Sequence, residues 1–161
     1  SIDPTTGQVL ETRRRNAGQV RHVFEMQDND IAWVTRDGRV GVLSSNAAPV
    51  NIPDMNPVHG ATLIDIGESG NSEIFIWSRE AAGPARGENV LIWNPRTQNF
   101  YAQQSQLFPD GNDYGAIRGA RSGGNSVFAW THRGQILRWS FNADGSDMYF
   151  HDTREHVREE L

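Results

Sequence analysis

The sequence predicts an all-β fold made of three four-stranded antiparallel repeat units. Three times, a turn leads into an apolar strand bearing a Trp near its end, then into a turn that carries Arg, then into a second apolar strand. The tryptophans are Trp33, Trp77 and Trp130, so the units repeat at intervals of 44 and 53 positions. Periods of this length indicate repeat architectures, and four-stranded propeller blades are among them.

Two further observations supply the other strands of each unit. A β-rich segment led by Gly18, Gly60 or Gly115 precedes each Trp strand and ends in Asp, Asn, Gly or Ser. A turn rich in Pro, Asn or Gly follows the second apolar strand, as at 94–99, and introduces a fourth strand. Turn residues that bound short β-rich runs are strand signals, and these connections are short enough for antiparallel neighbours.

Taken in chain order, the opening residues are expected to end a preceding unit, because a Pro- and Gly-containing turn leads into a short strand there. This end of a preceding unit covers 1–13, with its final strand at 9–12. Three complete units follow at about 18–52, 60–104 and 115–151. Together they form a single all-β repeat domain over 1–151. The polar tail, 152–161, carries Asp152 and Glu155 as a capping box, so a short helix is expected there.

The units resemble β-propeller blades of the tachylectin/tectonin type, most closely at 124–140. In those blades a short Gly-x-Asn/Asp turn leads into an apolar strand bearing Trp, and a Gly turn leads into a second apolar strand. The resemblance covers most of the chain and implies a β-propeller-like arrangement. Since tectonin-type propellers often bind carbohydrate, it also implies a lectin-like activity, without identifying residues that contact sugar.

Three units leave the closure of the fold open. Propellers typically have about four to eight blades, so three blades form an open arc that a second chain or further sequence completes. In this arc the fourth strand of each unit is expected to join the next sheet, which leaves 148–151 unpaired. An unpaired edge strand is a template for another chain, so a protein partner or self-association is expected to complete the propeller. The alternative is a β-trefoil, in which three units close within one chain.

The composition restricts the classes of function. With 161 residues, 37% hydrophobic and 22% charged, the chain is expected to be globular. No apolar run approaches the roughly 18 residues of a membrane span. The formal net charge of −5 argues against general binding of nucleic acid. The absence of Cys excludes disulfides and thiolate metal sites and leaves the localisation unknown.

No motif in the chain indicates catalysis, a metal or a cofactor. G-x-S-x-G, P-loop and H-E-x-x-H patterns are missing, and the closest histidines, His151 and His156, lack a zinc-binding spacing. We therefore expect no catalytic residue, no metal and no cofactor, although an enzyme with a loop-built active site stays a second alternative. Trp33, Trp77 and Trp130 are expected to share one position in their strands and to pack in the core.

Arginine is the feature that suggests a binding surface, since all 15 basic residues are Arg. The loops from second to third strand and from fourth to first strand share one face, and they are longer and richer than the others. They carry the candidate binding residues Arg13, Arg14, Arg15, Arg36, Arg79, Arg86, Arg133 and Tyr114. Such loops on a rigid scaffold commonly carry binding function. The alternative is that these arginines pair with nearby acids, as Arg36 would with Asp37.

The sequence thus predicts a non-enzymatic β-propeller-type module that acts as a protein-interaction scaffold through an arginine-lined loop face. A lectin-like carbohydrate-binding protein is the alternative, from the tectonin resemblance and the aromatic content. The sequence does not define the partner or the process.

Overall fold

The structure, a computed structural model, describes residues 18–152 except 46, 53–54, 56, 69, 81, 84–88, 103, 144 and 146. Its first sheet contains β1 (Val20–Glu25), β2 (Ile31–Thr35), β3 (Arg39–Val42) and β4 (Val50–Asn51). The second contains β5 (Val58–Ile64), β6 (Glu73–Ser78), β7 (Val90–Asn94) and β8 (Asn99–Ala102). The third contains β9 (Ile117–Gly123), β10 (Ser126–Thr131), β11 (Ile136–Phe141) and β12 (Met148–Asp152). The described helices are the short η1 (Gln27–Asn29), η2 (Ile66–Glu68) and α1 (Gln104–Leu107).

The fold class is therefore the predicted one: all-β, with three four-stranded antiparallel sheets. Each sheet contains four consecutive strands in chain order, and the sheets fall within about two residues of the predicted units. The predicted exchange of fourth strands is wrong, because β4 and β8 pair within their own units and β12 pairs with β11. Tight turns explain this: between β7 and β8, Asn94 Oδ1 accepts hydrogen bonds from the amides of Arg96 (3.0 Å) and Thr97 (3.3 Å). The predicted strand at 9–12 and most of the predicted tail helix lie outside the described residues.

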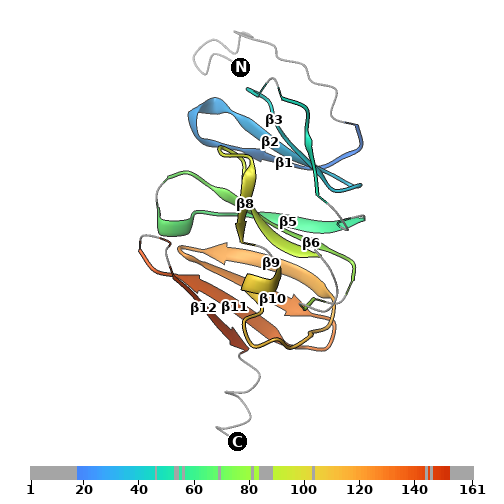
Figure 1. Cartoon of the computed structure of the whole chain (residues 1–161), viewed down its shortest axis with the longest axis vertical. Coiled ribbons are helices and arrows are strands. Elements are labelled where there is room, and N and C mark those ends of the chain that lie inside the picture. The colour runs from blue at the N-terminus through green and yellow to red at the C-terminus, as the bar shows by residue number, and fades with distance from the viewer. Residues whose placement is uncertain are drawn as a thin grey trace, which may run out of the picture.

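The three sheets are stacked along the long axis of the molecule, with the second sheet between the other two (Figure 1). Two apolar clusters fill the spaces between them. The first contains Ala32, Val34 and Val40 from the first sheet and Ile74, Ile76, Leu91 and Trp93 from the second. The other contains Phe75, Trp77, Val90 and Ile92 from the second sheet and Val127, Ala129, Leu137 and Trp139 from the third. Because successive side chains of a strand point to opposite faces, β6 contributes to both clusters and is buried along its whole length.

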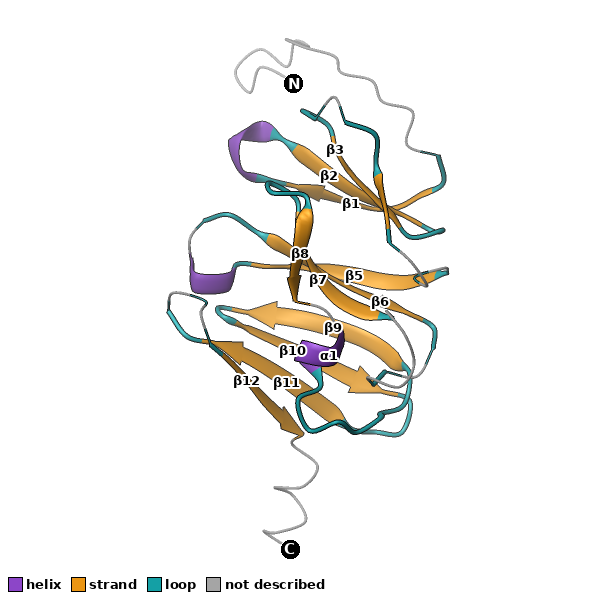
Figure 2. Ribbon diagram, viewed as in Figure 1, coloured by secondary structure: helices purple, strands orange, loops and turns teal. Residues whose placement is uncertain are grey.

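The arrangement is compatible with an arc of propeller blades. Contacts between the sheets include β1 with β5 and β5 with β9, the first strands of the three sheets. A propeller likewise repeats four-stranded sheets radially, with one strand of each nearest the axis. The β-trefoil alternative does not fit, since the first and third sheets lie at opposite ends of the stack (Figure 2).

Register shows that the three tryptophans do not share one position. Thr35, Ser78 and Thr131 occupy equivalent places, because each pairs across a β-bulge with the start of its first strand. Trp77 and Trp130 precede this place by one residue, whereas Trp33 precedes it by two and points to the opposite face. The expectation of a common position is therefore wrong for Trp33.

The expectation of core packing holds for Trp77 and is wrong for Trp130, while Trp33 is buried but belongs to neither apolar cluster. Trp33, Trp77, Trp93 and Trp139 are at most 7% exposed, but Trp130 is 42% exposed. Each tryptophan of the repeat lies over a cross-strand glycine, Gly41, Gly60 or Gly119, where a Cβ would overlap the indole. Glycine at these positions lets the large ring lie flat on the neighbouring strand.

Candidate interaction surfaces

The structure places Arg36, Arg79 and Arg133 in the turns that follow the second strands β2, β6 and β10, and all three are exposed. Backbone hydrogen bonds hold these turns. The amide of Arg36 donates to the carbonyl of Gln19 at 2.9 Å, its carbonyl accepts from Val58 at 2.8 Å, and His132 donates to Ala116 at 3.0 Å. The backbone is thus fixed while the arginine side chains face solvent.

The predicted pairing of Arg36 with Asp37 does not describe the local ion pair. Asp37 instead pairs with Arg39, with 3.1 Å between Nε and Oδ2, and its carboxylate accepts from the hydroxyl of Thr35. The hydrogen bond from Thr35 lowers the pKa of Asp37, and Arg39 lowers it further.

The other candidate residues divide into two groups. Arg13, Arg14, Arg15 and Arg86 lie outside the described residues. Tyr114 is 5% exposed, its ring packs on Phe108 and Phe150, and its hydroxyl donates to Asp110. Burial and the bond to Asp110 raise the pKa of Tyr114 well above its usual value. Tyr114 is therefore a core residue and does not contribute to the exposed face.

A basic cluster that the sequence did not predict lies at the inner edges of the sheets. Each first strand carries a β-bulge at the same place in the repeat, and the extra residues are Arg21, His59 and Arg118. A bulge leaves one residue unpaired and re-aims its side chain. Nothing in the spacing of these residues reveals the bulges, because they follow from register.

The cluster includes one of the predicted arginines. His59, Arg79 and Arg118 line a cleft of about 360 Å³ between the second and third sheets. Burial lowers the pKa of His59, and the positive charges of Arg79, Arg118 and Arg21 lower it further. The pKa of His22 on β1 is lowered in the same way, by burial and then by the positive charges of Arg21 and His59.

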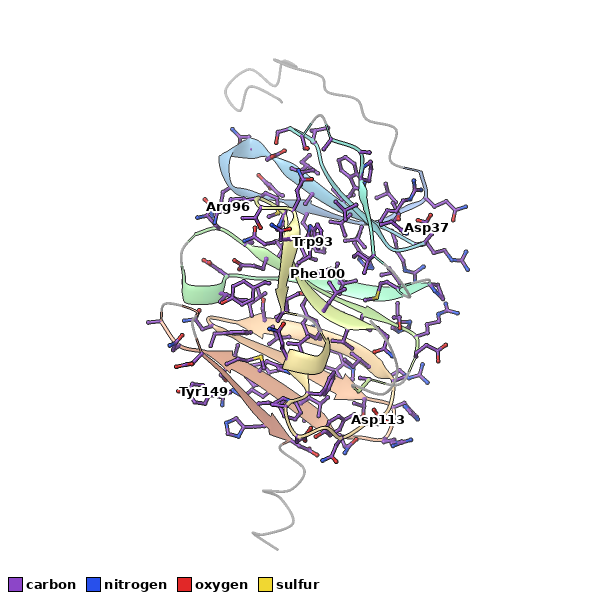
Figure 3. The ribbon with its side chains drawn as sticks, viewed as in Figure 1. Asp37, Trp93, Arg96, Phe100, Asp113 and Tyr149 are labelled. Atoms are coloured by element: carbon purple, nitrogen blue, oxygen red, sulfur yellow. The ribbon has the colours of Figure 1, made fainter. Side chains whose placement is uncertain are left out.

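A larger cleft, of about 590 Å³, opens at the opposite ends of the first and second sheets. Its walls combine the apolar Met26 and Val42 with polar turn residues and Arg96. Gln98 spans the two sheets through a 3.0 Å hydrogen bond from its Nε2 to Ser45 Oγ, in a left-handed backbone conformation (φ 55°). Arg96 projects at this edge, and Trp93 and Phe100 pack edge-to-face at 5.2 Å between the sheets (Figure 3).

The outer face of the third sheet is apolar and exposed. Phe128 is 38% exposed, Trp130 42%, Ile136 48% and Tyr149 56%. Tyr149 projects from the outer edge of this sheet (Figure 3). The exposed Arg121 and Arg138 flank Phe128 as its cross-strand neighbours, with the guanidinium of Arg138 5.4 Å from the ring centroid. Large apolar side chains exposed together on one face of a small protein commonly mark an interaction site.

No model of a known protein family matches the chain, and a search of curated proteins also found no match. No helix within the described part of the chain has the length and apolar character needed to cross a membrane. Among the same residues, no group of three or more His, Asp or Glu is placed to hold a metal ion.

Proposed function

We propose that the protein is a non-enzymatic, β-propeller-type interaction module whose open arc of three sheets is completed by a second copy of the chain. The observation that carries the proposal is the exposure of the third sheet at positions that are buried in the other two. At three positions of the repeat, the residue of the third sheet is exposed, and these residues are Phe128, Trp130 and Ile136. The equivalent residues are Ala32, Val34 and Val40 in the first sheet and Phe75, Trp77 and Val90 in the second, all at most 5% exposed.

The repeat also indicates what should cover this face. In the stack, the face bearing Phe75 and Trp77 packs against Val127, Ala129 and Leu137 of the next sheet. The face of the first sheet that is equivalent to the one bearing Val127 and Ala129 carries Trp33 and the exposed Val23, and it is the outer face of the stack. Continuing the repeat therefore places the third sheet of one copy against the first sheet of another.

Charge favours the same pairing. The outer face of the third sheet carries Arg121 and Arg138, so two such faces would repel each other. The outer face of the first sheet carries the exposed Glu25 two residues beyond Val23, and its Arg39 is already paired with Asp37. A head-to-tail contact uses two different surfaces and forms a ring if the rotation closes. Two copies would then bring six sheets together, within the usual range for propellers.

The test is the mass of the intact chain in solution by light scattering, with one variant for each surface. The wild type is expected to be a dimer or a larger ring, and both Phe128→Asp and Val23→Asp are expected to be monomers near 18.0 kDa. An equimolar mixture of the two variants is expected to associate, because one intact pair of surfaces remains. Asn99→Asp, at an exposed site on β8, is the matched control and should behave as the wild type. A wild-type chain that stays monomeric overturns the proposal.

The arginine-lined face is the second proposed contact surface and would recognise acidic polypeptides. Reversing the charge of Arg36, Arg79 and Arg133 together is expected to abolish binding of polyglutamate and to leave the melting temperature nearly unchanged, because these side chains are exposed. Fluorescence anisotropy and thermal unfolding measure the two effects. If the triple variant unfolds, the arginines are structural and this part of the proposal fails.

Trp130 favours one alternative, a lectin-like activity. One side of its indole lies over Gly119, and its exposed part offers a surface on which a sugar ring could stack. A glycan array provides the test. Binding at micromolar affinity that is lost in Trp130→Ala but kept in the monomeric Val23→Asp variant would favour the lectin over self-association.

A further inference from the structure

We propose that the bulge residues His59 and Arg118, together with Arg79, form an anion-binding site in the cleft between the second and third sheets, with Arg21 at the neighbouring bulge adding positive charge, for a ligand that carries a phosphate or carboxylate group. The site goes beyond the proposed self-association. It lies between the first strands rather than on the outer face of the third sheet, and it is complete within one copy.

The first argument is that the three bulge residues are equivalent in the repeat and all can carry positive charge. The bulges occur between Val20 and His22, between Val58 and Gly60, and between Ile117 and Gly119. Elsewhere the repeat varies freely in charge, as at Asp30, Glu73 and Ser126, which begin or directly precede the second strands. The chain as a whole is acidic, with a formal net charge of −5. A local excess of positive charge in such a chain requires an explanation other than composition.

The second argument is the shape of the site. His59, Arg79 and Arg118 surround the cleft of about 360 Å³, and Ala116 and Ile117 supply its small and apolar remaining lining. An arginine presents a planar fork of N–H donors that matches two oxygens of a phosphate or carboxylate. Apolar walls reduce the screening of these charges by water. The volume exceeds that of an inorganic anion, so the anionic group would belong to a larger molecule.

The third argument is the electrostatic environment of His59. The charged groups that act on its imidazole are Arg79, Arg118 and Arg21, and His22 on β1 is coupled to it as well. No acidic group is among these influences in the described part of the chain. One ring nitrogen donates to the backbone of Arg118, while the buried Nδ1 has no hydrogen-bond partner among the described residues. A bound anion would offset the three arginines and favour protonation of Nδ1, which could then donate to the anion.

The experiment is calorimetric titration of the full-length chain with inorganic phosphate and, separately, with acetate, at equal ionic strength set by NaCl. Saturable binding of one anion per chain is expected, with a dissociation constant in the millimolar range or lower. Tighter binding of phosphate would identify phosphorylated ligands as the natural class, and tighter binding of acetate would identify acidic side chains. Removing one charge-assisted contact with Arg118→Gln is expected to weaken binding by about ten- to a hundredfold.

Arg96→Gln is the matched control, because Arg96 is an exposed arginine of the second sheet that lies outside the cleft and outside the proposed dimer surfaces. It should bind as the wild type does. Titrations with acetate, which is fully ionised near neutral pH, in buffers of different ionisation heat should also show proton uptake, and His59→Gln should abolish this uptake. Equal loss in Arg118→Gln and Arg96→Gln would show only general charge attraction and overturn the site. Absence of saturable binding to both anions would also overturn it.

Discussion

The second and third sheets use the same repeat but differ in what covers them. Phe75 and Trp77 on β6 are 0% and 5% exposed, whereas their equivalents on β10, Phe128 and Trp130, are 38% and 42% exposed. The strand sequences are nearly the same in pattern, and both tryptophans lie over a glycine of the preceding strand. Burial is therefore determined here by the place of a sheet in the stack and not by the strand alone.

The inner face of the third sheet shows what a covered face requires. Trp139 lies there at 0% exposure and contacts Phe75 of the second sheet with 5.3 Å between ring centroids. Its indole Nε1 donates a 2.6 Å hydrogen bond to the carbonyl of Leu107 at the end of α1. Phe108, next to α1, meets the same indole edge-on at 5.7 Å. On the outer face of the same sheet, Trp130 has no aromatic contact among the described residues.

The largest expected difference between the sheets is the effect of removing the equivalent tryptophans. Trp77→Ala should cost about 3–5 kcal/mol of unfolding free energy, because it empties a large volume in the core. Trp130→Ala should cost below about 1 kcal/mol in the monomeric Val23→Asp background, because much of the ring is already in water. Chemical denaturation of both variants measures the difference. Equal losses would mean that the third sheet is covered in the monomer.

A smaller difference is expected for the glycines under these rings. In Gly60→Ala the added methyl group meets the indole of Trp77, which is enclosed and cannot move away, so a loss of about 1–3 kcal/mol is expected. In Gly119→Ala the indole of Trp130 can turn toward solvent, and a change within about 0.5 kcal/mol is expected. Denaturation midpoints again measure both. A loss in Gly119→Ala as large as in Gly60→Ala would show that Trp130 is held rigidly.

The sequence predicted four strands in each of the three units and the approximate limits of the units, because these depend on local signals. Turn residues such as Asn94 and Gly134 and the apolar runs between them mark each strand end. The sequence did not predict which face of a sheet a side chain occupies where a one-residue shift along the strand decides it. The Trp of unit one stands one place earlier than the others, and in a strand this moves the side chain to the opposite face.

The candidate site was predicted only in part, for a similar reason. Arg36, Arg79 and Arg133 lie in exposed turns, as expected, because they follow the second strands directly. Arg21 and Arg118 were missed because a bulge is a property of two paired strands. Tyr114 was misplaced because its loop folds inward, where the amide of Tyr114 donates to the carbonyl of Ala82, beyond the end of β6, at 2.5 Å.

The smallest expected effect concerns the start of the second strands, where the second sheet has Glu73 and the third has Ser126. Glu73 is 5% exposed and accepts a 3.0 Å hydrogen bond from the amide of Ile66. Burial raises the pKa of Glu73 above its ordinary value of 4.5, and the nearby Asp65 raises it further. The folded state therefore favours the neutral acid, and the ionised form costs stability as the pH rises through the folded pKa.

Glu73→Gln keeps an acceptor for the amide of Ile66 and removes this charge, so a gain on the order of 0.5–1 kcal/mol is expected at pH 7. The gain should disappear at pH values well below 4.5, because the wild-type carboxyl is then protonated in both the folded and the unfolded state. Unfolding free energies of both proteins across this pH range provide the measurement.

Glu80→Gln, at an exposed glutamate beyond the other end of β6, is the control and should change stability little at any pH. A gain that persists in acid would mean that the effect comes from packing and not from the buried charge. No gain at pH 7 would mean that water or Arg96 already compensates the charge, and the second sheet would then be less enclosed at this end than along Phe75 and Trp77.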